Sequence, residues 1–319
     1  MTPSALPLVS VVTPVYNGEA HLRECIESVL AQTYLNWDYM IVNNCSIDRT
    51  RDIAEEYAAR DARIRVLNNT HFVRVVANHN IAVRQISPRS EYCKVVAADD
   101  RLSPECLSRM VDLAQRHPSV GIVSSFGVRG EMNAVIPAQM PYTAPLIPGR
   151  EICRATLLGG PYLFGQPTSV LYRADLIRCH DPFFNESNIH ADAEVCFELL
   201  RYCDFGFVHE VLTYVRMSEK SLSRFSDRIN TYLAGNLYLL LKYGPIYLTS
   251  DEMQERIKVK LRNYYAFLAE SILNGLDMEL WKFHSSKLRD MGLPLRYSRL
   301  FAVIARRMLR LMLKRKEAV

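Results

Sequence analysis

Hydrophobic positions follow two alternating periods along the first hundred residues. Runs rich in β-branched residues predict strands at 8–16, 37–44, 63–69 and 92–100. The segments between these runs carry apolar residues at helical spacing, as at Leu22, Ile26 and Val29, and each predicts a helix with one buried face. Strands that alternate with helices predict an α/β fold with a doubly wound, mostly parallel sheet and right-handed crossovers.

Two adjacent acids, Asp99 and Asp100, end the fourth predicted strand. Ser103 is a suitable N-cap and Pro104 suits the first helical position, so a helix is expected to begin directly after the acids. Ligands of such sheets bind beyond the carboxyl ends of the strands, where this strand-to-helix turn lies. We therefore interpret the turn as part of a binding site.

The remaining pattern predicts the second half of the sheet and then a helical region. Prolines interrupt residues 118–165, which we expect to form loops with one or two strands. Later strands are predicted at 169–176 and 206–216, with a helix over 188–203 between them. The pattern is helical from about residue 226 to the end of the chain.

Composition and charge narrow the function classes. Eight cysteines form no C-x-x-C pair and no signal peptide precedes the first strand, so we expect a cytoplasmic protein with reduced thiols and no zinc site. No apolar stretch approaches the roughly 20 residues that span a bilayer. The formal charge of +5 arises in the tail, because residues 295–319 hold eight Arg or Lys and one Glu. We therefore expect no nucleic-acid partner.

The same tail predicts a basic amphipathic helix. Its apolar side is formed by Phe301, Ile304, Met308, Leu311 and Met312, and its basic side by Arg299, Arg306, Arg310 and Lys314. Such a helix suits a peripheral contact with anionic lipid on the inner face of the cytoplasmic membrane. A closing helix packed on the body or on a second subunit explains the same pattern, and the sequence leaves both interpretations open.

The Asp99–Asp100 pair needs a cationic partner. Two adjacent carboxylates repel each other, and neither is buried without compensation. A helix cap or full solvation is the simple alternative, but Ser103 already supplies a cap. The pair therefore predicts a divalent cation, Mg²⁺ or Mn²⁺, held by one or two carboxylates and completed by substrate phosphates.

Three segments in order carry a family resemblance: VSVVTPVYNGEAHLRECIESVLAQTY at 9–34, WDYMIVNNCSIDRT at 37–50 and AADD at 97–100. The chain resembles the inverting family-two glycosyltransferases of GT-A fold over about its first 220 residues. The resemblance implies metal-dependent transfer of a sugar from a UDP-, dTDP- or GDP-linked donor to a hydroxyl acceptor. It further implies a glycan or lipid-linked glycan as acceptor, in cell-surface polysaccharide or lipopolysaccharide assembly.

The resemblance assigns expected roles at the donor end. Asp99 is implied to coordinate the metal on the donor diphosphate with Asp100 beside it, whereas Ala97 replaces the first acid of the family's motif. The opening turn is implied to approach the base and ribose through Thr13, Pro14, Tyr16 and Glu19. A buried strand end, with Tyr16 as a packing residue, is the alternative interpretation of this turn.

Asn43 and Asn44 stand where the family commonly has acids. An amide both donates and accepts, so the pair is able to read a pyrimidine edge, although an acid that accepts from the ring N–H is lost. The alternative is a polar turn ahead of the next helix, with Asp48 as its cap.

The family places a catalytic carboxylate at a Glu-Asp step that opens a helix in the acceptor half. Ala191 and Asp192 occupy that step here, so the resemblance implies Asp192 as the general base and Glu194 as its backup. The helix dipole alone favours an acid in a first turn, which is the structural alternative. His190 is interpreted as the N-cap, as a polar neighbour or as an acceptor contact.

The resemblance also concerns two later segments. Arg216, Lys220 and Ser221 follow the last predicted strand and are implied to contact the diphosphate, with an ordinary exposed loop as the alternative. Residues 165–173 are similar to the family's floor of the donor-sugar and acceptor pocket. The implied division is a nucleotide-sugar half at 1–117, an acceptor half of the same domain at 118–225 and a helical C-terminal region at 226–319.

Other function classes explain the sequence less well. A nucleotidyltransferase usually needs a Gly-rich loop with an adjacent basic residue. The segment TPVYNGE at 13–19 has only one Gly and no basic residue. A dehydrogenase fails for want of G-x-G-x-x-G. A catalytically silent sugar-nucleotide-binding or scaffold protein gains support from Ala97 and the paired asparagines, but retention of Asp99, Asp100 and Asp192 favours an enzyme.

Overall fold

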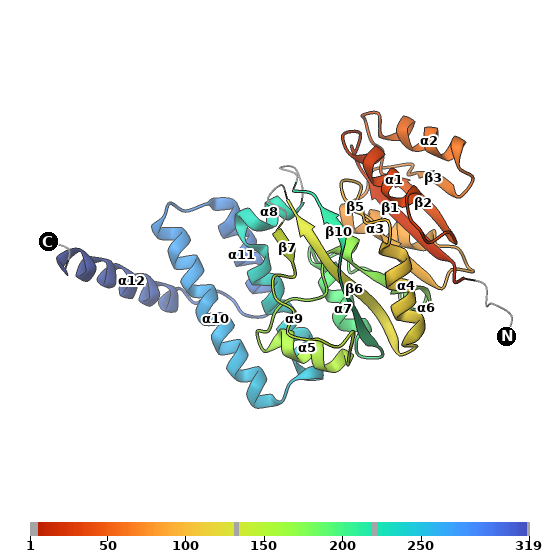
Figure 1. Ribbon diagram of the computed structural model, residues 1–319. Coiled ribbons are helices and arrows are strands. Elements are labelled where there is room, and N and C mark those ends of the chain that lie inside the picture. Colours follow the sequence, from red (N-terminus) through yellow and green to blue (C-terminus); the bar gives the residue numbers. More distant parts are fainter. Residues whose placement is uncertain (1–5, 131–133, 218–221, 318–319) are drawn as a thin grey trace. The chain divides into compact units, whose positions relative to one another are not determined.

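The structure is a computed structural model that describes residues 6–130, 134–217 and 222–317, and it forms two compact units, residues 1–217 and 218–319 (Figure 1). The first unit contains β1 (Val9–Val15), α1 (Leu22–Leu30), β2 (Trp37–Asn43), α2 (Thr50–Arg60), β3 (Ile64–Asn68), α3 (Val75–Arg84), β4 (Tyr92–Val95), β5 (Arg101–Leu102), α4 (Cys106–Arg116), β6 (Val120–Arg129), β7 (Ala134–Ile136), β8 (Leu146–Ile147), α5 (Gly149–Leu157), the 3₁₀ turn η1 (Pro167–Ser169), β9 (Leu171–Arg173), α6 (Ala174–Arg178), α7 (Ala191–Leu199) and β10 (Asp204–Val215). The second unit contains α8 (Leu222–Ile229), α9 (Thr231–Tyr247), α10 (Ser250–Leu273), α11 (Met278–Asp290) and α12 (Tyr297–Glu317).

The described strands form one sheet in the order β3-β2-β1-β4-β9-β6-β10-β5, with β7 paired to β6 and β8 to β10. Strands β1 to β4 run parallel, as do β6 and β10, whereas β9 is antiparallel to both of its neighbours. The chain runs outward from β1 to β3 and then returns to β4 on the other side of β1. The predicted α/β fold with a mostly parallel sheet is therefore confirmed, and its switch point lies between β1 and β4.

Helices cover both faces of this sheet. Every residue of β1 is buried, as expected for a strand with helices above and below it. Side chains of α1, α2 and α4 join one apolar cluster of the unit, whereas α3 packs on β1 and β2 without entering that cluster. Strands enclosed in this way leave only their ends open to ligands, so the loops at the strand ends carry the site.

The turn after β4 differs in detail from its prediction. The strand ends at Val95, and α4 begins only at Cys106 with Glu105 as its N-cap residue. Ser103 is not the helix cap, because its hydroxyl donates to the Glu105 carboxylate at 2.9 Å. The region at 118–165 is also more regular than predicted, since β6 spans ten residues despite the prolines that follow it.

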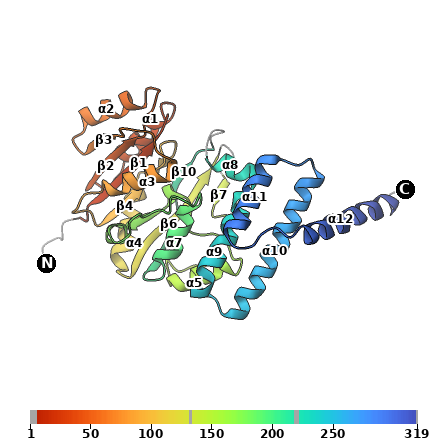
Figure 2. The ribbon, with the colours of Figure 1, turned by 180° about the vertical axis from the view of Figure 1, so that it is seen from behind.

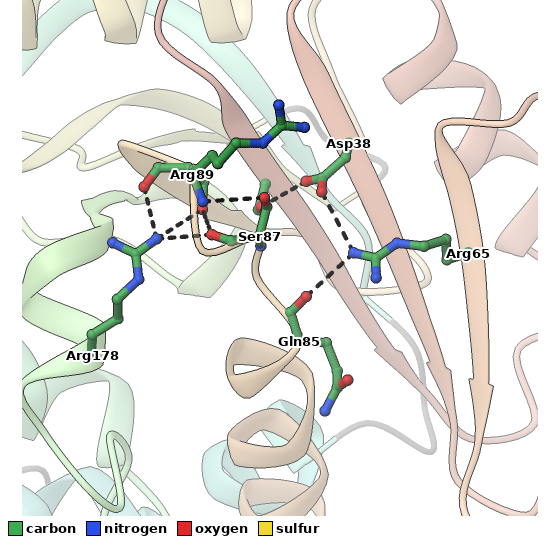
Figure 3. Close-up of polar contacts among 8 residues, drawn as sticks. Asp38, Arg65, Gln85, Ser87, Arg89 and Arg178 are labelled. Carbon is green, nitrogen blue, oxygen red and sulfur yellow. Dashed lines mark hydrogen bonds and ion pairs between the residues drawn. The ribbon is translucent and has the colours of Figure 1, made fainter.

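A polar network fixes the opposite, amino-terminal end of the parallel strands (Figure 3). Asp38 accepts from the Ser10 hydroxyl at 2.6 Å, and Ser10 accepts from the backbone N–H of Ser87 at 3.0 Å. Arg178 of α6 donates to the carbonyl oxygens of Ser87 and Ser90, both at 2.8 Å. These bonds hold the loop between α3 and β4, and therefore the start of the strand that leads to the acids.

The second unit has its own apolar core. Buried residues of α9, α10 and α11 form it, and Leu300 of α12 completes it at 2% exposure. His284 lies inside this core, where its ring bonds the Tyr264 hydroxyl at 2.6 Å and the carbonyl oxygen of Ile229 at 2.8 Å. The predicted boundaries at 117/118 and 225/226 stay predictions, and the structure itself divides the chain at Met217.

Replacing Arg178 with alanine should lower the free energy of unfolding by about 1 kcal/mol, because two backbone carbonyls lose a charged donor. Urea unfolding at neutral pH measures the change. Arg89→Ala is the matched control: only the backbone N–H of Arg89 enters the network, while its guanidinium lies outside it (Figure 3). Equal stability loss in both variants would contradict this role of Arg178.

Candidate active site

Asp100 is the fixed point of the turn after β4. Its carboxylate is 4% exposed and accepts the Thr168 hydroxyl at 2.5 Å and the backbone N–H of Arg216 at 2.9 Å. Thr168 also accepts from the backbone N–H of Ala97 at 3.0 Å. One carboxylate thus joins the turn, the η1 segment and the end of β10.

Asp99 lies beside it in a different environment. It is partly exposed, and no described residue donates a hydrogen bond to its carboxylate. Its backbone oxygen accepts from Nε of Arg216 at 3.3 Å. The side chain of Asp99 is therefore available to a ligand, whereas that of Asp100 is engaged by the protein.

Burial raises the pKa of Asp100 to about 7, and the nearby negative charge of Asp99 adds to the shift. The hydrogen bonds from Thr168 and Arg216 act in the opposite direction. A cation at this turn would lower the pKa of Asp100, because a positive charge favours the ionised form of both carboxylates.

Arg216 is the nearest described cation, and the structure places this predicted residue directly at the acids. Its guanidinium pairs with Glu24 of α1 at 2.9 Å rather than with either aspartate carboxylate. Arg101 also approaches Glu24, at 3.8 Å. Lys220 and Ser221, the other predicted phosphate contacts, lie outside the described residues.

A metal ion fits the turn under one condition. Within the described ranges no three His, Cys, Asp or Glu residues gather in a way that could hold an ion. The unengaged carboxylate of Asp99 and the raised pKa of Asp100, which a cation would lower, fit Mg²⁺ or Mn²⁺. These ions need only one or two protein carboxylates when substrate phosphates supply further oxygens. The fit therefore requires the phosphates of a ligand.

The opening turn after β1 presents one aromatic ring. Tyr16 is 48% exposed and meets the exposed ring of Phe72 edge to face, with 4.9 Å between the ring centroids. Thr13 is fully buried and bonds the Tyr39 hydroxyl at 2.8 Å, and Pro14 is also buried. The geometry favours the buried-strand interpretation for Thr13 and Pro14 and leaves Tyr16 open to a ligand.

Glu19 connects two turns of the protein. Its carboxylate accepts from the backbone N–H of Arg49 at 2.9 Å, while its own N–H donates to Asp48 at 3.1 Å. Asp48 also accepts from the backbone N–H of Thr50 at 3.0 Å, one residue inside α2. Glu19 thus has a structural partner at the place where the resemblance implies a ribose contact.

Asn43 and Asn44 belong to a buried network of asparagines. Asn43 donates to Asn68 at 2.8 Å and accepts from the backbone N–H of Ser46 at 3.1 Å. Asn44 donates to the carbonyl oxygen of Val73 at 2.8 Å and accepts from the backbone N–H of Val73 at 3.0 Å. Both amides are engaged within the protein, which favours the polar-turn interpretation that the sequence left open.

Asp192 lies in the first turn of α7, where His190 is the N-cap residue. Burial raises the pKa of Asp192, and the neighbouring His190 and His79 oppose the shift when they carry charge. His79 comes from α3, and its Nδ1 bonds the carbonyl oxygen of Val75 at 2.9 Å. Burial lowers the pKa of His79, so its neutral form is favoured.

Glu194 has a different function from Asp192 in the structure. Its carboxylate is 3% exposed and accepts from Asn188 at 2.7 Å and from Asn185 at 3.0 and 3.1 Å. These bonds hold the loop that leads into α7. The geometry therefore favours Asp192 over Glu194 as the proton acceptor.

Three residues at the site escaped the sequence analysis: Thr168, His79 and Glu24. Each reaches the site from an element distant in sequence. Glu24 and Thr168 lie in segments that carry the family resemblance, at 9–34 and 165–173, whereas no local motif distinguishes His79. Gly165 in that segment adopts φ +85°, and a Cβ there would lie 2.7 Å from Ser169, so the sharp turn before η1 requires glycine.

Comparison with known proteins identifies a matching family. The family model described as "Glycosyl transferase family 2" matches residues 10–180. A curated relative, the putative teichuronic acid biosynthesis glycosyltransferase TuaG of Bacillus subtilis, is 33% identical over 106 residues, which are 33% of this chain and 41% of TuaG. The chain spans 32% and 56% of the lengths of the first two curated relatives that it matches.

Solved structures share the fold at low sequence identity. S. aureus TarS 1–349 in complex with UDP-GlcNAc superposes with a TM-score of 0.67 at 18% identity, over 93% of this chain and 87% of the TarS 1–349 chain. The mannosyltransferase PcManGT of Pyrobaculum calidifontis, in complex with GDP-Man and Mn²⁺, gives 0.57 at 14% identity, over 96% and 88% of the two chains. These likenesses confirm the GT-A-like α/β fold.

The buried Asp100 predicts a pH dependence of stability in the presence of a chelator. Its pKa rises from about 3.9 in the unfolded chain to about 7 in the fold, so its contribution is fully present below pH 4 and lost as pH rises through 7. The pKa shift of Asp100 changes the free energy of unfolding by at most about 4 kcal/mol between these pH values. Between pH 4 and pH 8, urea unfolding should show a larger loss of the free energy of unfolding for the wild type than for Asp100→Asn. Equal losses in the two proteins would show that Asp100 is not the cause.

Proposed function

Because the chain belongs to glycosyl transferase family 2, we propose that it is an inverting glycosyltransferase that moves a sugar from a nucleotide-sugar donor to an acceptor hydroxyl. Support for the donor class comes from similar folds solved with UDP-GlcNAc and with GDP-Man. The observation that carries the proposal is the turn after β4, where the unengaged Asp99 carboxylate lies beside the buried Asp100 at the switch point of the sheet.

Asp99 and Asp100 would hold a divalent cation, Mg²⁺ or Mn²⁺, against the donor diphosphate. Such an ion, when bound, neutralises the negative charge that develops on the departing nucleoside diphosphate. The Mn²⁺ in the PcManGT complex is consistent with this role. Arg216 would contact a phosphate with the guanidinium that now pairs with Glu24, as the sequence resemblance implies.

The base of the donor would lie against the exposed ring of Tyr16, with Phe72 at its edge. The engaged amides of Asn43 and Asn44 hold the backbone beside this ring, so the base would meet backbone groups there. UDP-, dTDP- and GDP-linked donors all suit such a surface, because stacking on an aromatic face is available to every base.

Asp192 would accept the proton of the acceptor hydroxyl while that oxygen attacks the anomeric carbon. Its raised pKa makes Asp192 a stronger base than a solvated aspartate. Burial favours the neutral form of His79, and a neutral ring does not oppose this shift. A direct displacement inverts the anomeric centre and needs no covalent nucleophile.

A glycan or lipid-linked glycan is the proposed acceptor, in polysaccharide assembly at the cell surface. Similarity to TuaG, a putative teichuronic acid biosynthesis glycosyltransferase, supports this context. None of the described helices is both long enough and apolar enough to span a bilayer. We propose a cytoplasmic enzyme with peripheral membrane contact through its basic last helix.

Removal of the cation should abolish tight donor binding. Calorimetric titration of UDP-GlcNAc and GDP-Man with Mn²⁺ should give binding for the cognate donor that weakens at least tenfold in chelator and in Asp99→Asn. Asp112→Asn, an exposed acid on α4, is the matched control and should bind as the wild type does. Donor affinity unchanged by chelator would contradict the metal role.

Asp192→Asn should keep donor affinity and lose transfer by about 100-fold or more, because the amide does not accept the proton. Radiolabelled sugar transfer to a glycan acceptor measures the rate. Glu194→Gln should instead lower thermal stability, since the engaged carboxylate holds a loop. Turnover like that of the wild type in Asp192→Asn would move the base elsewhere, and donor binding without any transfer in the wild type would favour the catalytically silent alternative.

A further inference from the structure

A basic pocket of about 410 Å³ lies within the second unit, on α10 and α12, which pack against each other (Figure 2). This volume is typical of a site for a small molecule. Four cations and one acid are among the lining residues, which are Glu255, Lys258, Val259, Arg262, Tyr265, Arg299, Ala302, Val303 and Arg306. The four cations less the one acid leave a net charge of +3 on the lining.

One side of α12 alone faces this pocket. The lining positions of α12 recur at helical spacing along that side. The exposed apolar side chains of Tyr297, Phe301 and Met308 lie on the opposite side of the helix. The pocket therefore adjoins no apolar stripe of α12, and this favours a polar ligand.

The pocket cations are poorly compensated by the protein. Arg262 and Arg306 form no ion pair within the part of the chain that the structure describes. Glu255 is 3.7 Å from Lys258 and offsets one charge at most. Positive charge thus remains for a ligand.

Arg307 on the same helix shows the contrast. It lies outside the pocket lining and pairs with Glu270 at 3.0 Å, while it donates to the carbonyl oxygen of Ala266 at 3.1 Å. The arginine that joins α12 to α10 is thus compensated, whereas two of the arginines that line the pocket are not.

The third pocket arginine, Arg299, is oriented by Tyr265. Its guanidinium lies over the ring, 4.7 Å from the centroid. Tyr265 is 4% exposed, and its hydroxyl accepts from the backbone N–H of Arg296 at 2.9 Å. The ring orients the guanidinium without neutralising it. A cation that is already oriented loses less side-chain freedom when it binds an anion.

The spacing of the cations indicates the size of the anion. Arg299 and Arg306 are seven residues apart, which corresponds to about 10 Å along the axis of α12. Lys258 and Arg262 are four residues apart on α10, which corresponds to about 6 Å. Charges spread over this length suit a ligand with more than one anionic group.

We propose that this pocket is an anion site for a soluble ligand with two linked phosphate groups, formed by other residues than the proposed donor site. Each guanidinium presents a fork of N–H donors that matches phosphate oxygens. A lipid headgroup offers the same phosphate chemistry, but its acyl chains would meet no apolar stripe on the pocket side of α12. This inference goes beyond the proposed function and does not depend on sugar transfer.

Calorimetric titration of the full chain with inorganic pyrophosphate tests it. A chelator is present, so the ion-dependent donor site does not contribute. We expect binding that weakens as the salt concentration rises, because exposed charges are screened. Arg262→Ser combined with Arg306→Ser should raise the dissociation constant at least tenfold, because two charged donors are lost. Both residues are exposed, and circular dichroism with thermal unfolding verifies that the variant folds.

The matched control is Lys282→Ser with Arg289→Ser, which removes the same charge from exposed positions of α11 and should bind pyrophosphate as the wild type does. A wild type that binds no pyrophosphate, a pocket variant that binds it as tightly as the wild type, or an equal loss in both double variants would each overturn the pocket assignment. Flotation with phosphatidylglycerol vesicles that the pocket variant loses, without pyrophosphate binding, would assign the pocket to a lipid headgroup and overturn the soluble ligand. Donor titration with Mn²⁺ reports separately on the transferase.

Discussion

The hydrogen bonds to the buried carboxylate of Asp100 are the constraint on which the site depends. Thr168 and the backbone of Arg216 are 68 and 116 residues away in sequence, and both donate to this one group. Its environment raises the pKa to about 7, so the isolated protein bears a cost for keeping the charge. A cation bound at Asp99 would remove that cost, which couples the order of the turn to the ligand that brings phosphates.

The two halves of the strand-end surface solve the burial of polar groups in different ways. Beside β1 and β2, neutral amides of Asn43, Asn44 and their partners bond one another, so no charge is buried. Beside β4, carboxylates remain and need a counter-charge. The end beside β1 and β2, proposed for the base, has its polar groups bonded without a ligand. The end beside β4, proposed for the diphosphate, keeps carboxylate charge that the described residues do not neutralise.

The second unit also carries charged side chains that the described residues do not neutralise. Arg307 has an acidic partner, but Arg262 and Arg306 have none among the described residues. The two explanations of the last helix that the sequence left open, packing and lipid binding, concern different sides of that helix and do not exclude each other.

The sequence by itself determined the order of strands and helices over the first hundred residues, the α/β class, the family and the acidic turn after β4. Periodicity and β-branched composition are local properties, and they are legible without tertiary contacts. The same reasoning misplaced the cap at Ser103, because whether a hydroxyl caps a helix depends on where the helix begins in the fold. Only the tertiary structure decided which polar groups remain free for a ligand. Thr13, Glu19 and Glu194 are engaged by partners from elsewhere in the chain, while His79 and Thr168 arrive from other elements, since hydrogen-bond partners are set by the packing of distant segments.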